Sequence, residues 1–565
     1  MSCVYEDYYK EIMDEHGRIV SVKTRYNEDF NFAYDVVRRY ASLEPDKLAL
    51  VHKSREGKVT RYSFRDLELL SNRAAHVLRD MGVGRGDAVM LILKRRVEFW
   101  ISIIAIHKLG AVAVPTSHMV SAEDIHERVK IAGCRIVIGV NLDQICEKIE
   151  EALEGTECRL LVVGEDFKKF PNIGRLMLRA RDKLTRVHTR VHDSMLYYFT
   201  SGTSGSPKAV VHDFSYPIAH IYTARNWHGM RDGDLHLTVA DSGWAKTAWG
   251  KLYGQWFIGA AIMVYDYEQF YAADLLKLIE EQKINTFCAP PTVYKYLVRE
   301  NLNGYDLSNL HAVTTAGEPM PAEVLEKFRE KTGLIVREGF GQTETALLIC
   351  NPIYGDPEKN MGNGCIGFAS PMYHVELVDE DNNPVETGKE GEIVIVPDKN
   401  KIPIGVFTGY LGDEEQYKEA WRGGVYHTRD MAIRDENGAF TFVGRNDDVI
   451  KSSGYRIGPS EVEDILMRHP AVFECAVTGY PSKNRGTIVK ASVIIKDGYR
   501  AGHELKSDLT EFVKKRTAIY KYPRMIEFVS DLPRTGNGKI SRAAIRKKDM
   551  ENVFSHVICQ GDDSR

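Results

Sequence analysis

The stretch FTSGTSGSPK, from Phe199 to Lys208, stands out in a chain in which 43% of the residues are hydrophobic. Nine of its ten residues are Thr, Ser, Gly, Pro or Lys. Gly202 and Gly205 adopt positive φ without steric cost, so the backbone can turn its N–H groups toward one point. The hydroxyl groups add donors, and Lys208 adds a positive charge at the exit. Such a loop suits an anion, above all a phosphate chain.

A second interpretation of the same loop is a flexible connector, because serine- and glycine-rich segments usually serve that purpose. The P-loop pattern does not apply, since it requires Gly directly before the Lys and Ser or Thr directly after it. This chain has Pro207 and Ala209 at those positions. A nucleotide site here therefore follows another scheme, and the rest of the chain must decide between the two interpretations.

The composition excludes several classes of protein. A chain of 565 residues is long enough for several domains with ample cores. Its 75 basic and 79 acidic residues give a net charge of −4, so we expect no nucleic-acid partner. The nine cysteines include no Cys-x-x-Cys pair, which indicates reduced thiols in an intracellular protein rather than disulfides or a zinc site.

The sequence also predicts no membrane segment. The charged start MSCVYEDYYKEIMDEHGR has no apolar core and is therefore not typical of a signal peptide. The apolar run WFIGAAIMVY, Trp256–Tyr265, is too short to span a bilayer. We expect a cytoplasmic protein with no membrane partner, present as a monomer or homo-oligomer.

Apolar runs alternate with helical patterns from about Phe30 to Met372. Near-continuous apolar strands between helices are typical of parallel sheets that are covered on both faces. From about Tyr373 the pattern changes to antiparallel strands with turns. The clearest expected elements are strands at residues 88–94, 111–117, 134–140, 160–166, 284–290 and 311–317, and helices at residues 66–82 and 98–110.

The segment NDDVIKSSGYRIGPSE, Asn446–Glu461, is polar and contains Gly and Pro, which predicts a linker. Beyond it, helical and strand patterns alternate over about one hundred residues, as in a small α+β domain. We therefore predict an α/β fold. A large N-terminal domain of stacked α/β sheets with a β-rich subdomain covers residues 1–446, and a small mobile domain covers residues 447–565, with a hinge near Asp447.

Four further stretches share the polar, glycine-containing character of a binding site: TTAGEPM (Thr314–Met320), EGFGQTE (Glu338–Glu344), YHTRD (Tyr426–Asp430) and LPRTGNGKI (Leu532–Ile540). With the opening loop and the linker, they resemble the ordered motifs of the adenylate-forming superfamily. That superfamily contains acyl- and aryl-CoA synthetases, luciferases and the adenylation domains of peptide synthetases. The resemblance covers almost the whole chain. The stretches DSGWAKTAWG, FGQTE and SSGYRIGPSEVE are most similar to the medium-chain acyl-CoA synthetases.

The resemblance implies a nucleotide site with ATP and Mg²⁺. The opening loop would clasp the β- and γ-phosphates through Thr200, Ser201, Gly202, Thr203, Ser204, Gly205 and Lys208. The adenine pocket would be formed by Gly317, Glu318, Pro319, Glu338, Gly339 and Phe340, with Gly341 and Gln342 in the same motif. Thr343 would bond the α-phosphate, Glu344 would ligate Mg²⁺, Asp430 and Arg445 would hold the ribose, and Lys539 would reach the α-phosphate and the attacking carboxylate.

Each of these roles suits the chemistry of its residue. An aromatic ring stacks well on adenine, and Mg²⁺ prefers carboxylate oxygen. Taken alone, Phe340 could be a core residue, Asp430 a turn residue and Lys539 a surface lysine. The sequence favours the functional interpretation because the residues occur together. The catalytic candidates are Lys539, Thr343, Glu344 and Lys208.

The implied reaction has two steps. A carboxylate oxygen attacks the α-phosphorus of Mg·ATP to give acyl-AMP and pyrophosphate, and the thiol of coenzyme A then displaces AMP to give acyl-CoA. By resemblance, the candidate CoA residues are Ser453, Gly454, Tyr455, Arg456, Arg485, Lys514, Tyr522 and Arg524. The basic residues among them could equally form ordinary solvated faces.

The candidate acyl-pocket residues are Trp227, Trp244, Lys246, Trp249, Cys288 and Gly341. Peptide-synthetase domains hold an amino group with an Asp where this chain has Ala240, which argues against an amino-acid substrate. Acetate-specific members carry Trp at the position of Gly341, so we expect the pocket to continue past Gly341 and to accept short- or medium-chain or branched acids of roughly four to eight carbons.

Two alternatives remain open. One is an aryl-CoA ligase for benzoate-like acids. The other is a catalytically inactive nucleotide-binding sensor, which the presence of Lys208, Glu344, Asp430 and Lys539 disfavours.

Overall fold

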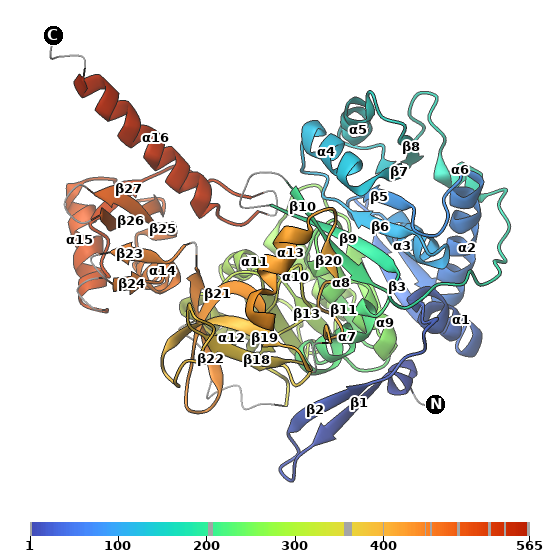
Figure 1. Cartoon of the computed structure of the whole chain (residues 1–565), viewed down its shortest axis with the longest axis horizontal. Coiled ribbons are helices and arrows are strands. Elements are labelled where there is room, and N and C mark those ends of the chain that lie inside the picture. Colours follow the sequence, from blue (N-terminus) through green and yellow to red (C-terminus); the bar gives the residue numbers. More distant parts are fainter. Residues whose placement is uncertain are drawn as a thin grey trace.

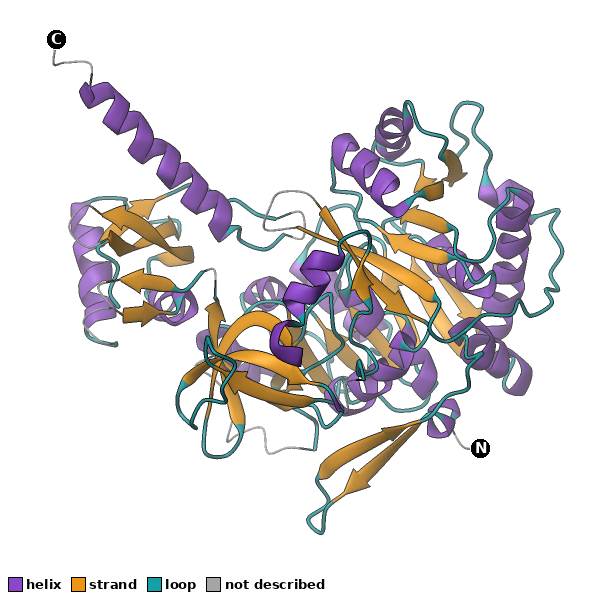
Figure 2. Ribbon diagram, in the orientation of Figure 1, coloured by secondary structure: helices purple, strands orange, loops and turns teal. Residues whose placement is uncertain are grey.

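The computed structural model describes residues 3–201, 207–354, 364–398, 401–446, 448–452, 455–482, 486–517, 521–535 and 538–561. Figure 1 shows a large body that contains two large sheets and a small C-terminal unit beside it, from which the last helix, α16 (Arg542–Gly561), projects. Helices lie around the sheets of both parts (Figure 2). The predicted α/β fold class is confirmed.

The first large sheet has seven strands in the order β20-β10-β9-β6-β5-β7-β8. Strands β8, β7, β5, β6 and β9 are parallel to one another, whereas β10 pairs antiparallel with both β9 and β20. The strand bounds are β5 (Ala88–Ile92), β6 (Val112–Pro115), β7 (Cys134–Val140), β8 (Arg159–Val163), β9 (Ser194–Ser201), β10 (Pro207–Asp213) and β20 (Gly409–Tyr410). The strands expected at residues 88–94, 111–117, 134–140 and 160–166 are confirmed.

The second large sheet has thirteen strands in the order β18-β19-β21-β22-β17-β16-β15-β14-β13-β11-β12-β3-β4. Its central strands, from β15 to β3 in this order, are parallel, and both flanks are antiparallel. The parallel strands are β3 (Leu48–Lys53), β11 (Leu235–Thr238), β12 (Ala261–Tyr265), β13 (Thr286–Cys288), β14 (Ala312–Ala316) and β15 (Val336–Phe340). The flanks are β4 (Val59–Ser63), β16 (Ile349–Cys350), β17 (Cys365–Ala369), β18 (His374–Val378), β19 (Glu390–Val396), β21 (Tyr426–Arg434) and β22 (Ala439–Arg445).

The change from parallel to antiparallel pairing comes earlier than the sequence pattern predicts. It occurs at β16, Ile349–Cys350, rather than near Tyr373. Strand β16 has only two residues and both are buried, so it lacks the alternation of apolar and polar residues that is typical of an antiparallel strand. The antiparallel flank therefore continues the same sheet instead of forming a separate one.

The remaining elements of the large body are mainly helices that cover the sheets. An N-terminal hairpin of β1 (Tyr9–Met13) and β2 (Ile19–Thr24) projects from the body (Figure 1). The α-helices are α1 (Arg39–Leu43), α2 (Phe64–Asp80), α3 (Glu98–Lys108), α4 (Ala122–Ala132), α5 (Ile145–Leu153), α6 (Ile173–Met177), α7 (Tyr216–Tyr222), α8 (Lys246–Gly250), α9 (Tyr253–Ile258), α10 (Ala272–Glu281), α11 (Pro291–Leu297), α12 (Ala322–Thr332) and α13 (Glu414–Ala420). The short helical turns are η1 (Val4–Asp7), η2 (Ala33–Arg38), η3 (Thr223–Trp227), η4 (Leu302–Gly304) and η7 (Arg422–Gly424).

The C-terminal unit has its own sheets and core. Its strands are β23 (Ile450–Ser452), β24 (Tyr455–Ile457), β25 (Val472–Ser482), β26 (Gly486–Ile495) and β27 (Met525–Phe528), and its helices are α14 (Pro459–Met467), α15 (His503–Lys514) and α16. Val462, Leu466 and Val493 belong to a core cluster confined to this unit. The boundary between residues 446 and 447 stays a prediction, and Asp447 lies outside the described residues.

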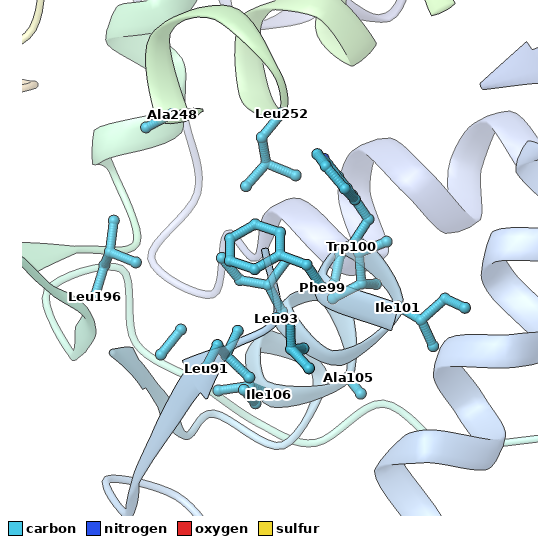
Figure 3. Close-up of a cluster of buried hydrophobic side chains, with 14 of the residues drawn as sticks. Leu91, Leu93, Phe99, Trp100, Ile101, Ala105, Ile106, Leu196, Ala248 and Leu252 are labelled. Atoms are coloured by element: carbon cyan, nitrogen blue, oxygen red, sulfur yellow. The ribbon is translucent and has the colours of Figure 1, made fainter. Parts of the chain in front are cut away.

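Helix α3 lies in the core beside the first sheet and is buried on all sides. Phe99, Trp100 and their neighbours pack against β5 and against Leu252, which precedes α9 (Figure 3). The indole Nε1 of Trp100 donates to the carbonyl of Lys251 at 2.6 Å, so this buried polar atom is satisfied. The cluster thus joins the first sheet to the helices that carry the candidate acyl residues.

We expect Phe99→Ala to lower the free energy of unfolding by about 3–5 kcal/mol, because a fully buried ring is removed from a close-packed cluster. The measurement is urea denaturation followed by circular dichroism. Leu69→Ala on α2, where the leucine is 36% exposed, is the control and should change the free energy by less than about 1 kcal/mol. Equal effects of the two substitutions would contradict the packing described for this cluster.

Candidate active site

The stretch FTSGTSGSPK belongs to a β-hairpin. Residues 199–201 end β9 and residues 207–208 begin β10, with Lys208 opposite Thr200, so the ends of the predicted loop are strands. Gly202, Thr203, Ser204 and Gly205 lie outside the described residues, as does the side chain of Ser201, and their phosphate contacts stay predictions.

Lys208 stands at the start of β10, with its amine 6.0 Å from the ring centre of Tyr410. Burial lowers its pKa, and Arg429 adds to the decrease, while Asp413 and Glu344 oppose it. The amine of Lys208 therefore lies near the guanidinium of Arg429 and near the carboxylate of Glu344, which is predicted to bind Mg²⁺.

Lys539, from the C-terminal unit, reaches the loop that follows β14. A Cβ atom built on Gly317 would lie 3.8 Å from Cε and 3.9 Å from Nζ of Lys539. Gly317 has φ +106°, a conformation that other residues rarely adopt. The structure thus brings together two predicted site residues that are more than two hundred positions apart in the sequence.

The environment of Lys539 is that of a deep but open site. Surrounding protein atoms lower its pKa, Glu318 and Asp430 oppose this decrease, and Lys246 and Arg445 add to it. The side chain nevertheless remains exposed to solvent, so it lies at an opening rather than in the core. A small cavity of about 70 Å³ nearby is lined from the large body by residues that include Tyr198, Trp244 and Thr343, and from the C-terminal unit by Thr535.

Asp430 and Arg445 occupy opposite positions on the neighbouring strands β21 and β22. Gln342 fixes the aspartate, because its amide Nε2 donates to Asp430 Oδ2 at 2.5 Å and to the carbonyl of Thr428 at 2.7 Å. The hydroxyl of Tyr426 in turn donates to Gln342 Oε1 at 2.7 Å. Burial raises the pKa of Asp430 to about 6, although Arg445 and Gln342 oppose the increase.

Glu344 is held by a residue that the sequence did not indicate. The hydroxyl of Tyr410 donates to Glu344 Oε1 at 3.0 Å. Burial raises the pKa of Glu344, against a hydrogen bond from its own backbone and the one from Tyr410. The sequence around Tyr410 contains no motif that points to this role. Tyr410 lies on β20 of the first sheet, whereas Glu344 follows β15 of the second sheet, so only the tertiary structure brings them together. The neighbouring Thr343 is anchored through its carbonyl, which accepts from His212 Nε2 at 2.8 Å.

The EGFGQTE motif begins on β15, and its first residues are held by Trp227. The indole Nε1 of Trp227 donates to the carbonyl of Glu338 at 3.1 Å. A Cβ atom on Gly339 would approach this indole to 2.6 Å, so only glycine fits there. Phe340 is only half-buried, with its ring 6.1 Å from that of Phe442, and it is therefore available for stacking.

The predicted acyl residues are brought together only in part. Trp227 and Trp249 meet edge to face with ring centres 6.4 Å apart, and both are buried. Lys246 points to the adenine loop, where its amine donates to the carbonyl of Ala316 at 3.0 Å. Trp244 is partly exposed and faces the C-terminal unit, 3.9 Å from the position of a Cβ on Gly538. Cys288 is buried at the end of β13.

The expectation of open space beyond Gly341 is wrong. A Cβ atom on Gly341 would lie 2.4 Å from Cη2 of Trp249 and 2.5 Å from the carbonyl oxygen of Ala346. The indole of Trp249 therefore fills the volume that the missing side chain leaves. Glycine is needed here for the close approach of that ring rather than for a longer pocket.

Three of the predicted CoA residues form a cluster on the C-terminal unit. Arg524 Nη1 donates to the hydroxyl of Tyr522 at 2.8 Å, and its guanidinium lies 4.8 Å from the ring centre. The amine of Lys514 lies 4.6 Å from the same ring and 2.6 Å from Glu511 Oε1. Ser453, Gly454 and Arg485 lie outside the described residues, as do the side chains of Tyr455 and Arg456, so their roles stay predictions.

Within the ranges that the structure describes, no group of three or more His, Cys, Asp or Glu residues could hold a metal ion. A site with a single carboxylate such as Glu344 suits Mg²⁺ only when substrate phosphates supply further ligands. In the described part of the chain, no helix is both long and apolar enough to cross a bilayer.

Comparison with protein families gives two matches. The AMP-binding enzyme family matches residues 37–411, and the AMP-binding enzyme C-terminal domain matches residues 461–539. The resemblance indicated by the sequence motifs is thereby confirmed.

Curated relatives match over nearly the whole chain. "Acyl-coenzyme A synthetase ACSM3, mitochondrial" of Mus musculus is 34% identical over 565 residues, which is 97% of this chain and 96% of the relative. The Homo sapiens protein of the same name is 37% identical over 537 residues, 93% of this chain and 91% of the relative. "Acyl-coenzyme A synthetase ACSM5, mitochondrial" of Rattus norvegicus is 37% identical over 533 residues, with 92% and 91% covered.

Solved structures show the same fold. An acyl-CoA synthetase of Brucella canis is 30% identical, with a TM-score of 0.71 over 93% of this chain and 96% of that one. The anthranilate CoA ligase AuaEII in complex with anthranoyl-AMP is 26% identical, with a TM-score of 0.84 over 94% and 99%. A benzoate CoA ligase from Burkholderia xenovorans LB400 is 25% identical, with a TM-score of 0.79 over 92% and 100%.

The buried carboxyl of Glu338 provides a test of the site's electrostatics. It is 4% exposed and accepts only a long hydrogen bond, 3.3 Å, from the backbone N–H of Met320. Burial raises its pKa to about 8, and Asp464 of the C-terminal unit adds to the increase. Between about pH 4.5 and 8 the folded state therefore binds more protons than the unfolded state, so stability falls as the pH rises.

We expect Glu338→Gln to raise the melting temperature relative to the unaltered protein at about pH 9 and to change it little at about pH 5, because glutamine does not titrate. Thermal unfolding at both pH values is the measurement. Glu436→Gln, at an exposed position, is the control. A stabilisation that does not depend on pH would show that the carboxyl is not protonated in the folded protein.

Proposed function

The chain belongs to the AMP-binding enzyme family, and we propose that it is an ATP-dependent acyl-CoA synthetase. It converts a carboxylic acid and ATP to acyl-AMP and pyrophosphate, and then transfers the acyl group to coenzyme A with release of AMP. The position of Lys539 beside Gly317, Glu318 and Asp430 carries this proposal, because it brings a cation from the C-terminal unit to the nucleotide motifs of the large body.

The first step depends on positioning and charge. Asp430 and Arg445 would hold the ribose, and Gln342 keeps the aspartate in one orientation. Negative charge builds up on the α-phosphate and the attacking carboxylate during displacement, and Lys208, Lys539 and Thr343 would stabilise it. Groups fixed in place before the reaction lower the barrier in this way without covalent participation.

Mg²⁺ is the expected metal. Glu344 fits it, because Tyr410 donates to only one of the two carboxylate oxygens, and Lys208, at the end of the predicted phosphate loop, is close enough to affect the pKa of the carboxyl. The ion would neutralise phosphate charge and orient the leaving pyrophosphate. Glu344 must be ionised to serve as a ligand, and Lys208 and Arg445 nearby favour that form.

Transfer to coenzyme A would use the C-terminal unit. Lys514, Tyr522 and Arg524 combine two cations with an aromatic ring, which suits the phosphates and the adenine of this co-substrate. If Lys539 and the CoA residues act on different faces of the unit, the unit must rotate between the two steps, with Asp447 as the proposed hinge.

The acid is short- or medium-chain, or branched, in our proposal. The contact of Trp249 with Gly341 limits the depth of the pocket in that direction. Two observations favour the aryl-CoA alternative: two of the structural neighbours are ligases of anthranilate and benzoate, and Trp227 and Trp249 pack edge to face among the predicted acyl residues. Cytoplasmic location stays a prediction, since the curated relatives are named as mitochondrial.

We expect Lys539→Ala to reduce acyl-AMP formation by about a hundredfold or more, comparable to the loss of one charge-stabilising group. Thioester formation from supplied acyl-AMP should be largely retained, because Lys539 acts in the first step only. Pyrophosphate release and CoA consumption report the two steps, and Lys547→Ala, an exposed lysine on α16, is the control. Equal loss in both steps would contradict the division of labour.

We expect Arg524→Ala to raise KM for coenzyme A by about five- to tenfold, the effect of one exposed charge-assisted contact. Pyrophosphate release without CoA should not change. Arg500→Ala, an exposed arginine on the same unit, is the matched control. An unchanged KM for CoA would remove the Tyr522 cluster from the proposed CoA site.

A further inference from the structure

Four aromatic side chains form a closed group beneath the acyl residues: Tyr216, His220, Trp249 and Tyr253. The ring of His220 lies 4.6 Å from Tyr216, 6.1 Å from Tyr253 and 6.3 Å from Trp249, centre to centre. Tyr216 and Tyr253 are 6.1 Å apart. His220 and both tyrosines are at most 1% exposed, and Trp249 is 5% exposed.

The polar atoms of this group have no protein partners. Both ring nitrogens of His220, the hydroxyls of Tyr216 and Tyr253, and Nε1 of Trp249 are buried without a hydrogen bond. Trp249 faces the Tyr216 hydroxyl, but the two atoms do not meet hydrogen-bond geometry. Each buried polar atom left unpaired costs about 1–3 kcal/mol, so five such atoms in one place favour the binding of a polar partner.

His220 is the central member of the group. Burial lowers its pKa to about 3, so the imidazole is neutral at physiological pH. A neutral imidazole has one donor and one acceptor nitrogen, and a tyrosine hydroxyl offers both functions. The group can therefore bind an uncharged partner that both donates and accepts, such as a hydroxyl, or one that accepts, such as a carbonyl oxygen.

The group is continuous with the proposed reaction site. Trp249 contacts the α-carbon of Gly341 in the EGFGQTE motif on one side and His220 on the other. Tyr198, an electrostatic neighbour of Tyr216 and Tyr253, lines the cavity beside Thr343. The indole of Trp249 therefore separates the Gly341 side of the acyl site from the four-ring group, and an acyl chain that displaces the indole ends among hydrogen-bonding groups rather than in an apolar pocket.

We propose that His220, with Tyr216 and Tyr253, binds a hydrogen-bonding group at the end of the acyl substrate farthest from its carboxylate. The preferred acids then carry a hydroxyl or a carbonyl at that end. This proposal rests on the acyl-CoA synthetase activity proposed above and names its substrate class. Water held among the four rings would satisfy the same atoms, and the experiment below separates the two occupants.

The experiment compares acids that differ only at the far end. Butyrate, hexanoate and octanoate are each paired with the ω-hydroxy acid of the same length, and kcat/KM is measured by pyrophosphate release. At the best-fitting length we expect the hydroxy acid to exceed its parent by about tenfold, because a site with buried polar groups rejects an analogue that leaves them unpaired. His220→Leu should abolish or reverse this preference, and His220→Gln, which keeps a donor and an acceptor, should retain part of it.

His107→Leu is the matched control. His107 is also a buried histidine with an unpartnered Nε2 and a ring 6.0 Å from Tyr253, but it belongs to α3, and no ring contact joins it to Trp249. We expect this variant to lose stability and to keep the ratio of the two acids. Since a ratio does not depend on the folded fraction of the enzyme, it separates recognition from folding.

The outcomes are distinct. No pyrophosphate release with any acid would overturn the proposed activity and this inference with it. Release with equal kcat/KM for parent and hydroxy acids at every length, unchanged by His220→Leu, would overturn the inference alone and assign the buried atoms to internal water. If His220→Leu fails to fold, the ratio in the unaltered enzyme and in His220→Gln decides.

Discussion

The approach of the Lys539 side chain to Gly317 is the constraint on which the rest of the site depends. The lysine belongs to the C-terminal unit, whereas Gly317, Asp430 and Arg445 belong to the large body. The backbone of Gly317 has φ +106°, which glycine adopts readily and other residues rarely do, and a Cβ atom there would lie 3.8–3.9 Å from the lysine side chain, in ordinary van der Waals contact. The conformation described here is therefore one in which the two parts of the chain share a single charged site.

Buried carboxyl groups lie among the nucleotide motifs, and burial favours their protonated forms. Glu338, Glu344 and Asp430 all have raised pKa values, and burial is the largest cause in each case. The raised pKa values reduce the negative charge that would repel a triphosphate, although Glu344 must be ionised to bind Mg²⁺. Three cations add positive charge to the same region: Lys208, Lys539 and Arg445. Positive charge attracts the phosphates of ATP.

Much of the fold could be predicted because its signals are local. Continuous apolar runs gave the strands β5 to β8, and a helical period gave α2 and α3. The order of the motifs indicated the family, but local patterns could not reveal contacts between distant segments. Tyr410 on Glu344 and the indole of Trp249 against Gly341 are examples, since each joins residues that only the tertiary structure brings together. The missing side chain of Gly341 predicts open space, whereas the indole of Trp249 fills that volume.

Strand β20 has a consequence for the synthesis of the chain. It pairs with the edge of β10 at Val210 and Val211. In the sequence, however, β20 (Gly409–Tyr410) follows all the parallel strands of the other sheet. A ribosome must add roughly two hundred more residues before this edge can be paired, and at ordinary elongation rates that takes about 10–40 s. During that interval the nascent protein exposes an apolar strand edge, the kind of surface on which chains aggregate and which chaperones protect.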